Sequence, residues 1–417
     1  MYRFSLTLLL CILLGAPSIL TPAAACTSAV VSGKATPDGR PLLWKNRDTG
    51  HVLNHIAYVQ GERYAFIANV NSDDFPARKE AWIGTNAAGF SLMNTQSYNL
   101  MEVAEDEERG EANGRIIYRA LELCATVQEF CHFLDTIAKP SLIEANFGVI
   151  DAQGGAAILE VDYHGYKLYD ANDPEVAPHG YVTRTNFSVS GTKGEGAGYV
   201  RFLEADRVLQ EAASTHSITP QLIFQRLSRS FRNAQLNIDL CSEPFCSAQA
   251  EQWFVDQDFI PRHSTSCSIV VQGVLPNEHP ELTTMWTLLG YPPTGVTLPL
   301  WLKGADHLLP SSVCYDAACK ASPLSRHSRT LLDEVFSLHK GMGTDRYFCW
   351  SMLYNARGNG YMQQLVPVEQ HLFSLAQPFL ESWRREGHID LTALEQLYTQ
   401  LTDALQPVWN LTLNCNH

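Results

Sequence analysis

Positive charge is scarce in this sequence of 417 residues. Lysine and arginine together number 30, against 44 aspartate and glutamate residues, which gives a formal net charge of -14 at pH 7. A chain with this balance is poorly suited to nucleic acid or to an anionic membrane surface, so we expect neither as a partner. The acidic balance does not indicate which substrate or ligand the protein takes.

Long hydrophobic runs are also few. The run from Phe4 to Leu14 follows a single basic residue, Arg3, and precedes small residues that end at Ala25. This order is typical of a secretory signal with an A-x-A-like cleavage site, and the apolar run is too short to span a membrane. No later stretch approaches the length of a membrane span. We therefore expect residues 1–25 to be removed and the remaining chain to be secreted or periplasmic, without a transmembrane segment.

The sequence has no evident internal repeat, no low-complexity tract and none of the Cys-x2-Cys pairs that usually hold structural zinc. It nevertheless contains 11 cysteines, of which Cys11 would leave with the signal. Closely spaced cysteines in an exported chain suggest disulfides. The close pairs are Cys241/Cys246, Cys314/Cys319 and, as a weaker case, Cys124/Cys131. Cys267 lies in the strand-like segment "TSCSIVVQG" and is expected to be a buried free thiol.

The segment "PAAACTSAVVSG" places Cys26 directly after the predicted cleavage site. Three roles are open for a cysteine at that position: a catalytic nucleophile, a lipid attachment point or half of a disulfide. Lipoprotein signals favour leucine three positions before the cysteine, whereas this chain has Ala23. An N-terminal cysteine carries an α-amine with a reference pKa of about 7.7–8.0, so much of it is neutral near pH 7. A neutral amine can take the thiol proton and so activate the thiolate for attack on a carbonyl.

The pattern along the chain predicts an α+β protein. Strand-like segments run from Thr27 to about Gln96, and helical periodicity begins at Arg115. A capping box of Thr126 and Glu129 predicts a second helix. Strands return at residues 146–170 and 266–290, while residues 366–409 read as helical with a break near Gly387. Strands and helices do not alternate regularly, which favours a layered α+β fold over a parallel sheet. We expect a domain over residues 26–305 and a mostly helical extension, 306–417, packed on it.

Several motifs in order resemble the N-terminal-nucleophile (Ntn) cysteine amidohydrolases. This clan contains choloylglycine hydrolases, penicillin V acylases, acid ceramidases, penicillin acyltransferases and secreted dipeptidases. The matching segments are "CTSAVVSGKATPDGRPLLWKNRD", "IGTNAAGFSLMN", "NFGVIDAQGGAAILEVD", "YVTRTNFS" and "YVRFLEA". The match covers residues 26–210 well and the strands near residues 266–290 more loosely. The resemblance implies a four-layer αββα sandwich with the nucleophile at the end of a central strand.

The resemblance also implies a set of site residues. They are Cys26, Lys45, Asp48, Asn94, Asn186 and Arg201. Cys26 would be the nucleophile, and Asp48 would hold its α-amine. Asn186, with Asn94 as a second donor, would stabilise the tetrahedral oxyanion, and Arg201 would fix the site electrostatically. Related sequences usually have arginine where this chain has Lys45.

Each role has an ordinary structural alternative. Asp48 could be a turn residue, Lys45 a solvated lysine and Arg201 a surface arginine at the start of a helix. Asn186 could be a turn asparagine or, with Phe187 and Ser188, a glycosylation sequon. The nearby Arg47 could supply the cation at the thiol in place of Lys45, since the two residues share a face of an alternating strand. We expect His263 to be structural, because the α-amine already supplies a base.

The sequence therefore predicts an exported hydrolase that cleaves a linear amide bond through an acyl-thioester on Cys26. The same intermediate would also allow acyl transfer to an amine. A small amide or a short peptide is the expected substrate, and no metal or organic cofactor is implied. The alternative from another class is a lipid-anchored, non-catalytic binding protein on the same fold. Acylation of the Cys26 amine would remove the base and thioether formation would remove the thiol, so the two functions exclude each other.

Overall fold

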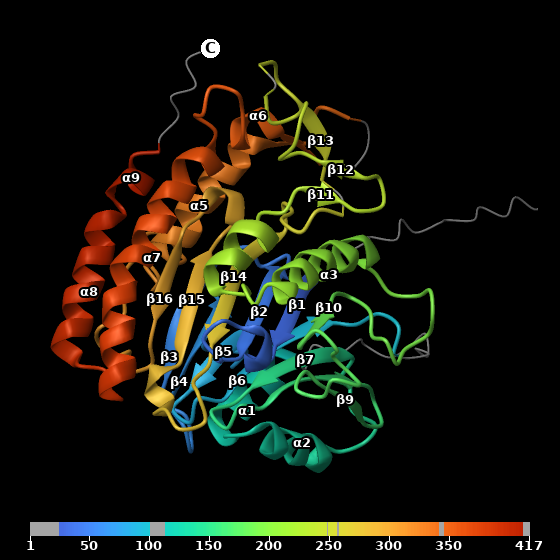
Figure 1. Ribbon diagram of the computed structural model, residues 1–417, viewed down its shortest axis with the longest axis vertical. Helices are drawn as coiled ribbons and strands as arrows, with labels where there is room; N and C mark the ends of the chain where they lie inside the picture. Colours follow the sequence, from blue (N-terminus) through green and yellow to red (C-terminus); the bar gives the residue numbers. More distant parts are fainter. Residues whose placement is uncertain (1–24, 101–112, 248, 257, 342–345, 412–417) are drawn as a thin grey trace, which may run out of the picture.

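A computed structural model describes residues 25–100, 113–247, 249–256, 258–341 and 346–411 (Figure 1). The expected signal segment before Ala25, including Cys11, lies outside these residues, as does the acidic stretch at 102–111. Among the described helices, none is both long and apolar enough to cross a membrane.

One sheet has seven antiparallel strands that follow one another in chain order. Its strands are β3 (Asn54–Val59), β4 (Phe66–Asn71), β5 (Ile83–Asn86), β6 (Ser91–Gln96), β7 (Ala145–Ile150), β8 (Ala156–Val161) and β9 (Tyr166–Asp170). The predicted strand pair around Gly61 and the pair around Asn-Ala-Ala-Gly are both confirmed. In the second turn, Gly89 has a φ of 74°, a conformation that residues with a Cβ rarely adopt.

The other sheet has six antiparallel strands in the order β10-β1-β2-β14-β15-β16. Its strands are β1 (Cys26–Val31), β2 (Leu42–Asp48), β10 (Tyr181–Arg184), β14 (Thr265–Gln272), β15 (Thr284–Leu289) and β16 (Thr297–Leu300). Cys26 is the first residue of β1 and lies opposite Arg47 of β2. Asp48, at the end of β2, pairs with Thr265 of β14 just before a register shift. This sheet therefore brings the ends of three strands together at Cys26.

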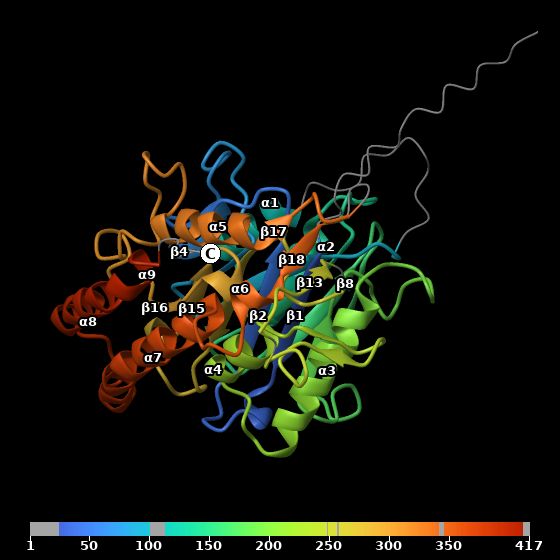
Figure 2. The same cartoon turned by 90° about the horizontal axis from the view of Figure 1, so that it is seen from above.

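The two sheets pack face to face, with β1 and β2 lying against β6 and β7. Every residue of β1 and β2 is buried, because both faces of their sheet are covered. Helices α1 (Asn113–Leu123) and α2 (Val127–Thr136) cover the outer face of the seven-stranded sheet. On the other side, α3 (Tyr199–Ser214) packs on β1 and β10. Figures 1 and 2 show the resulting four layers, and the predicted αββα sandwich is confirmed.

Residues beyond 306 add helices to the outer face of the six-stranded sheet. They are α5 (Pro323–Val335), α6 (Trp350–Leu353), α7 (Tyr361–Glu386), α8 (Leu391–Ala404) and α9 (Gln406–Trp409). The predicted break is confirmed, since α7 ends at Gly387, which has a φ of 78°. The helices share one hydrophobic core with the sheet. Trp286 of β15, for example, stacks on Phe373 of α7 with ring centroids 4.4 Å apart.

Smaller elements complete the fold. A three-stranded sheet and a two-stranded ribbon lie outside the main sheets. Their strands are β11 (Arg232–Asn233), β12 (Ile238–Asp239), β13 (Trp253–Val255), β17 (Phe336–Ser337) and β18 (Tyr347–Cys349). Helix α4 (Pro220–Leu222), which Thr219 caps, is short and gives way to a π-helical turn at Ile223–Leu227. The sequence did not indicate this change in helix type.

The predicted disulfides are not formed in this structure. All nine cysteines among the described residues are free thiols. Cys124 and Cys131 are buried beneath the seven-stranded sheet, and both contribute to its hydrophobic core with α1 and α2. Cys267 is fully buried in β14, as predicted.

Candidate active site

Cys26 lies at the centre of a network of buried polar groups. It is 5% exposed and is still joined to Ala25 in this structure, so its nitrogen is an amide. That nitrogen donates a hydrogen bond to Oδ1 of Asn186 at 3.0 Å. The thiol points toward the backbone carbonyl of Asp48, with 4.0 Å between Sγ and the oxygen.

Asn186 follows β10 and is fully buried. It is therefore neither an exposed turn residue nor an accessible glycosylation site. Its Oδ1 accepts hydrogen bonds from Cys26 and from Nη2 of Arg201, and its Nδ2 donates to the Gln96 carbonyl at 2.8 Å. These partners fix the orientation of the side-chain amide. Asn186 thus presents its oxygen to Cys26, whereas the sequence predicted that it would present its nitrogen to the substrate.

A buried carboxylate holds the loop that carries Asn186. Glu160 of β8 accepts from Nε of Arg184 at 2.7 Å and from the backbone nitrogens of Val189 and Ser190 at 2.7 and 2.8 Å. Burial raises the pKa of Glu160, but Arg184 and the bonds from Ser190 and Val189 outweigh it, so the net pKa lies below the usual value. Glu160 therefore stays ionised and clamps both ends of the loop.

Arg201 of α3 is buried rather than on the surface, with 1% of its area exposed. Its Nη1 donates to the Cys26 carbonyl at 2.7 Å and to Oγ1 of Thr27 at 2.8 Å. Burial lowers the pKa of Arg201 to about 10, so it still carries its charge at neutral pH. The first turn of α3 thereby ties a permanent positive charge to the first residues of β1.

Lys45 is also buried, with 1% exposed, which rules out a solvated lysine. Its Nζ donates to Oδ1 of Asn94 at 2.8 Å and to the Trp82 carbonyl at 3.0 Å. Burial lowers the pKa of Lys45 to about 8, against the attraction of Cys26. Arg47 shares the face of Lys45 as expected, and its guanidinium lies 4.4 Å from the centroid of the Trp82 ring. Both cations therefore lie on the thiol side of β2.

Asp48 is occupied by partners other than Cys26. Its Oδ2 forms an ion pair with Arg262, and its Oδ1 accepts from the hydroxyl of Thr265. The contact that we expected between this carboxylate and the Cys26 nitrogen is not made here, because that nitrogen binds Asn186 instead. Arg262 also lies 3.5 Å from the Ala25 carbonyl. Asp48 and Arg262 therefore form one buried pair beside the bond that joins Ala25 to Cys26.

Sequence reasoning missed Arg262. The only signal was a basic residue three positions before Thr265, at the start of the strand that pairs with β2. The sequence predicted that the neighbouring His263 is structural, and its side chain contacts arginines rather than Cys26. Its Nε2 lies 2.8 Å from Arg329 and 3.2 Å from Arg346. Burial, together with these two arginines, lowers the pKa of His263 to about 3, so its imidazole is neutral.

A cavity of about 590 Å³ opens at the Ala25–Cys26 junction. Its walls include Ala25, Tyr98, Gly198, Arg201 and Arg262 from the main domain. Removal of Ala25 and the residues before it would open this space onto the Cys26 nitrogen. The cavity is large enough for a small-molecule ligand.

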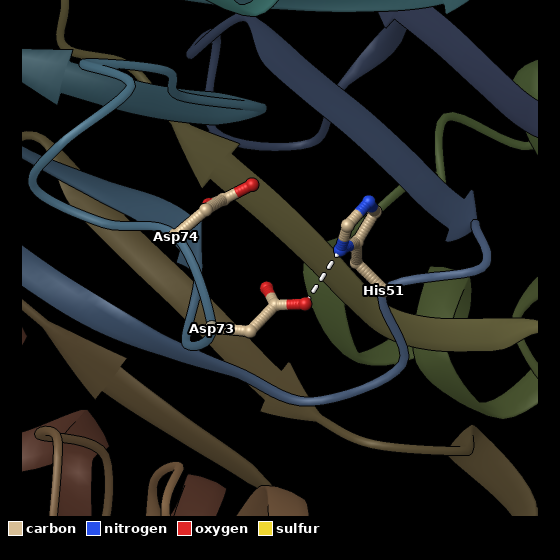
Figure 3. A group of neighbouring side chains, drawn as sticks. All are labelled: His51, Asp73 and Asp74. Atoms are coloured by element: carbon tan, nitrogen blue, oxygen red, sulfur yellow. Dashed lines mark hydrogen bonds and ion pairs between the residues drawn. The ribbon is translucent and has the colours of Figure 1, made fainter.

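One group of side chains has the composition of a metal site. Figure 3 shows Asp73 pointing at His51, with Asp74 beside it on the loop after β4. Nδ1 of His51 lies 2.8 Å from Oδ2 of Asp73, and the two side chains are 46% and 61% exposed. A hydrogen bond between Asp73 and a half-exposed histidine accounts for this arrangement, so we assign no metal to it.

No family model and no curated protein matches the sequence. Solved structures do resemble it. A variant of conjugated bile acid hydrolase from Clostridium perfringens is 13% identical, with a TM-score of 0.39 over 67% of this chain and 93% of that one. A Caenorhabditis elegans N-acylethanolamine-hydrolyzing acid amidase is 14% identical, with a TM-score of 0.39 over 60% and 94% of the two chains.

A third similar structure is penicillin V acylase from Agrobacterium tumefaciens. It is 12% identical, with a TM-score of 0.37 over 67% of this chain and 86% of that one. The three similar structures are thus a bile acid hydrolase, an acid amidase and a penicillin acylase.

Proposed function

We propose that this chain is an exported Ntn amide hydrolase in which Cys26, freed by removal of residues 1–25, is the nucleophile. The proposal rests on the surroundings of Cys26. The Cys26 nitrogen is held by Asn186, its carbonyl is held by Arg201, and a cavity begins at the residue that precedes it. A free α-amine at this position would sit beside its own thiol and face the cavity.

The chemistry needs only this amine and thiol. The neutral α-amine takes the thiol proton, and the thiolate adds to the amide carbonyl of the substrate. Collapse of the tetrahedral intermediate breaks the C–N bond, and the α-ammonium returns its proton to the leaving amine. Water then attacks the thioester, giving up a proton to the α-amine, which passes it to the departing thiolate. An amine in place of water would give acyl transfer from the same intermediate.

The remaining predicted residues take supporting roles in this proposal. Lys45 and Arg201 place positive charge around the thiolate, which favours its ionised form. Asp48, neutralised by Arg262, orders the end of β2 next to the thiol. The oxyanion role of Asn186 and Asn94 stays a prediction, because Nδ2 of Asn186 donates to Gln96 and Oδ1 of Asn94 accepts from Lys45 in the present arrangement.

The test combines mass analysis with an amide panel. Intact mass and N-terminal sequencing of the exported protein should give Cys26 as the first residue, without a lipid. Cys26→Ser should fold normally and be nearly inactive, because an amine removes the proton of a hydroxyl far less readily than that of a thiol. Cys246→Ser is the matched control, since it removes a more exposed thiol outside the cavity. A diacylglyceryl mass on Cys26 would instead support the anchored binding protein.

A further inference from the structure

The cavity beside Ala25 has more arginines than carboxylates in its wall. Four arginines line it: Arg201, Arg262, Arg329 and Arg346. The carboxylates in its wall are Asp256 and Asp258, while the whole chain carries a net charge of -14. Burial raises the pKa of Asp256 to about 7, so this group is only partly ionised near neutral pH. A positive cavity on an acidic protein concentrates anions at that point.

Two of these arginines converge on one neutral acceptor. Nη2 of Arg329 and Nη1 of Arg346 lie 2.8 and 3.2 Å from the same Nε2 of His263. A neutral imidazole nitrogen offers a single lone pair, so it cannot fully satisfy both guanidinium groups. Nη1 of Arg329 also donates to the His263 carbonyl at 3.1 Å, and its Nη2 pairs with Asp333 at 3.0 Å, although the Asp333 side chain is 60% exposed. Within the described part of the chain, no carboxylate lies at ion-pair distance from Arg346.

The other two arginines retain donors of their own. Nε of Arg201 and Nε of Arg262 are both buried and have no hydrogen-bond partner among the described residues. A buried donor without a partner costs free energy, so these two guanidinium groups keep hydrogen-bonding capacity that the described residues do not use. The convergence of Arg329 and Arg346 on one acceptor is the observation that points to an anionic ligand.

The two converging arginines come from the segment that the family motifs do not cover. Arg329 lies on α5, and Arg346 directly precedes β18. Their place in the wall means that residues beyond 306 take part in forming the cavity as well as covering the sheet.

We infer that the amide substrate of this chain carries a carboxylate or a similar oxyanion, which Arg329 and Arg346 bind in the cavity next to Cys26. This inference rests on the proposed function. The guanidinium groups suit a carboxylate because each can offer two parallel N–H donors. The anion could belong to the acyl part or to the leaving amine, and the substrates of the test separate these two sources.

The first measurement does not require turnover. Mature protein is alkylated with iodoacetate, which is anionic, or with iodoacetamide, which is neutral and of similar size. Label on the Cys26 peptide is followed by mass spectrometry, and a short peptide beginning with Cys-Thr gives the intrinsic ratio of the two rates. Relative to that peptide, we expect the protein to favour iodoacetate by about tenfold or more, because an excess of positive charge in a cleft raises the local concentration of anions. Added salt should reduce the preference.

The double variant Arg329→Gln/Arg346→Gln should lose most of this preference. Arg385→Gln is the matched control, because it removes an exposed arginine of α7 that does not line the cavity. Thermal melting shows whether the double variant is folded. The effect of salt on the iodoacetate preference of the parent protein tests the electrostatic attraction without any substitution. A preference equal to that of the peptide would overturn the inference. A preference that survives in the folded double variant would overturn the assignment to Arg329 and Arg346.

Substrate pairs complete the test. N-acylglycines are compared with the matching N-acylglycinamides, and succinyl anilides with butyryl anilides. We expect kcat/KM to be higher for the anionic member of one pair, and to fall by about tenfold to a hundredfold in the double variant, as for the loss of hydrogen bonds to a charged group. Equal rates for both members of both pairs would overturn the inference but leave the hydrolase intact. Failure to cleave any amide, with or without charge, would instead overturn the proposed function.

Discussion

The backbone nitrogen of Cys26 lies 3.0 Å from Oδ1 of Asn186, a residue 160 positions away in the sequence. Nη2 of Arg201 donates to the same oxygen at 2.9 Å. One amide oxygen therefore fixes both the nitrogen of the proposed nucleophile and the cation that holds its carbonyl. This geometry gives Asn186 an acceptor role at Cys26, in addition to any donor role toward an oxyanion.

Replacement of Asn186 separates these two roles. Asn186→Ala removes both, and we expect kcat to fall by about 10²–10³, as for the loss of one oxyanion donor. Asn186→Asp keeps an acceptor for Cys26 and Arg201, so it should retain more activity if the acceptor role matters. Asn99→Ala is the control, because Asn99 bonds the carbonyls of Ser188 and Thr192 in the same loop without touching Cys26. A near-normal kcat for Asn186→Ala would remove Asn186 from the site.

Lys45 should give the reaction an alkaline limit. Burial lowers the pKa of Lys45 to about 8, so its positive charge is lost as the pH rises through that value. The support that this cation gives to the thiolate disappears over the same range. Lys45→Arg keeps the charge at higher pH and should move the alkaline limb of kcat/KM upward, whereas Lys45→Gln should lower activity even at pH 7.

The alkaline limb needs a control because the proposed mechanism requires one proton on the amine and thiol of Cys26 together, and loss of that proton at high pH would also stop the reaction. Lys303→Arg makes the same chemical change at a lysine that is 41% exposed and pairs with Glu281. It should leave the pH profile unchanged. If Lys45→Arg also leaves the profile unchanged, the limb comes from loss of the proton that the amine and thiol of Cys26 share, and Lys45 has only a structural role through Asn94.

Local patterns predicted much of the fold. The strand pairs, the cap at Thr126 and the end of α7 at Gly387 follow from turn residues, capping residues and periodicity, all of which act between near neighbours in the chain. Asp48 and Arg262 show what such patterns miss. Their ion pair joins residues 214 positions apart and depends on the register of β2 against β14. Nothing in either segment alone indicates that register.

The candidate site also combines features that the sequence predicted with features that it did not. The ordered motifs named Cys26, Lys45, Asn94, Asn186 and Arg201. In the structure, buried hydrogen bonds join Asn186 to Cys26 and Arg201, and separately join Lys45 to Asn94. The direction of those bonds was not predictable, because an asparagine can donate or accept with equal ease. The arginines that the C-terminal segment contributes to the cavity were also missed, since no motif places α5 beside the proposed nucleophile.

A buried ion pair anchors the long C-terminal helix. Glu369 of α7 accepts from both terminal nitrogens of Arg229, at 2.7 and 2.9 Å, and the two side chains are 0% and 1% exposed. Removing one partner leaves a buried charge without compensation, which typically costs about 3–5 kcal/mol. We expect Glu369→Gln to lower the free energy of unfolding by about this amount in chemical denaturation.

The matched control for this pair is Glu381→Gln on the same helix, where the exposed carboxylate accepts a hydrogen bond from the side chain of Gln377. Its effect should stay within about 0.5 kcal/mol, as for most surface substitutions. Equal effects of the two variants would mean that Arg229 finds other compensation, for example from the carbonyls of Pro292 and Gly295 that it already contacts.

Asp256 should make stability depend on pH near neutrality. Its Oδ2 accepts from the backbone nitrogen of His263 at 2.9 Å, while its Oδ1 is buried without a partner among the described residues. Burial raises the pKa of this carboxyl from 3.8 to about 7. A raised pKa means that the folded state holds the proton more tightly than the unfolded state. The resulting stability is fully present below about pH 4 and is lost as the pH rises through about 7.

Asp256→Asn tests this because asparagine resembles the protonated carboxyl. The Tm of the variant minus that of the parent should grow between pH 5 and pH 8, with Asp258→Asn as the control from the same cavity. Buried neutral histidines such as His55, whose pKa burial lowers to about 4, oppose this trend below pH 6.5, but they contribute to both proteins and cancel in the difference. Alkylation of Cys26 gives a second readout. In the parent, the preference for iodoacetate over iodoacetamide should weaken over the same pH range, because ionised Asp256 makes the cavity less positive. In Asp256→Asn, the preference should weaken less than in the parent. A Tm difference that does not change with pH would show that Asp256 is already ionised in the folded protein at pH 5.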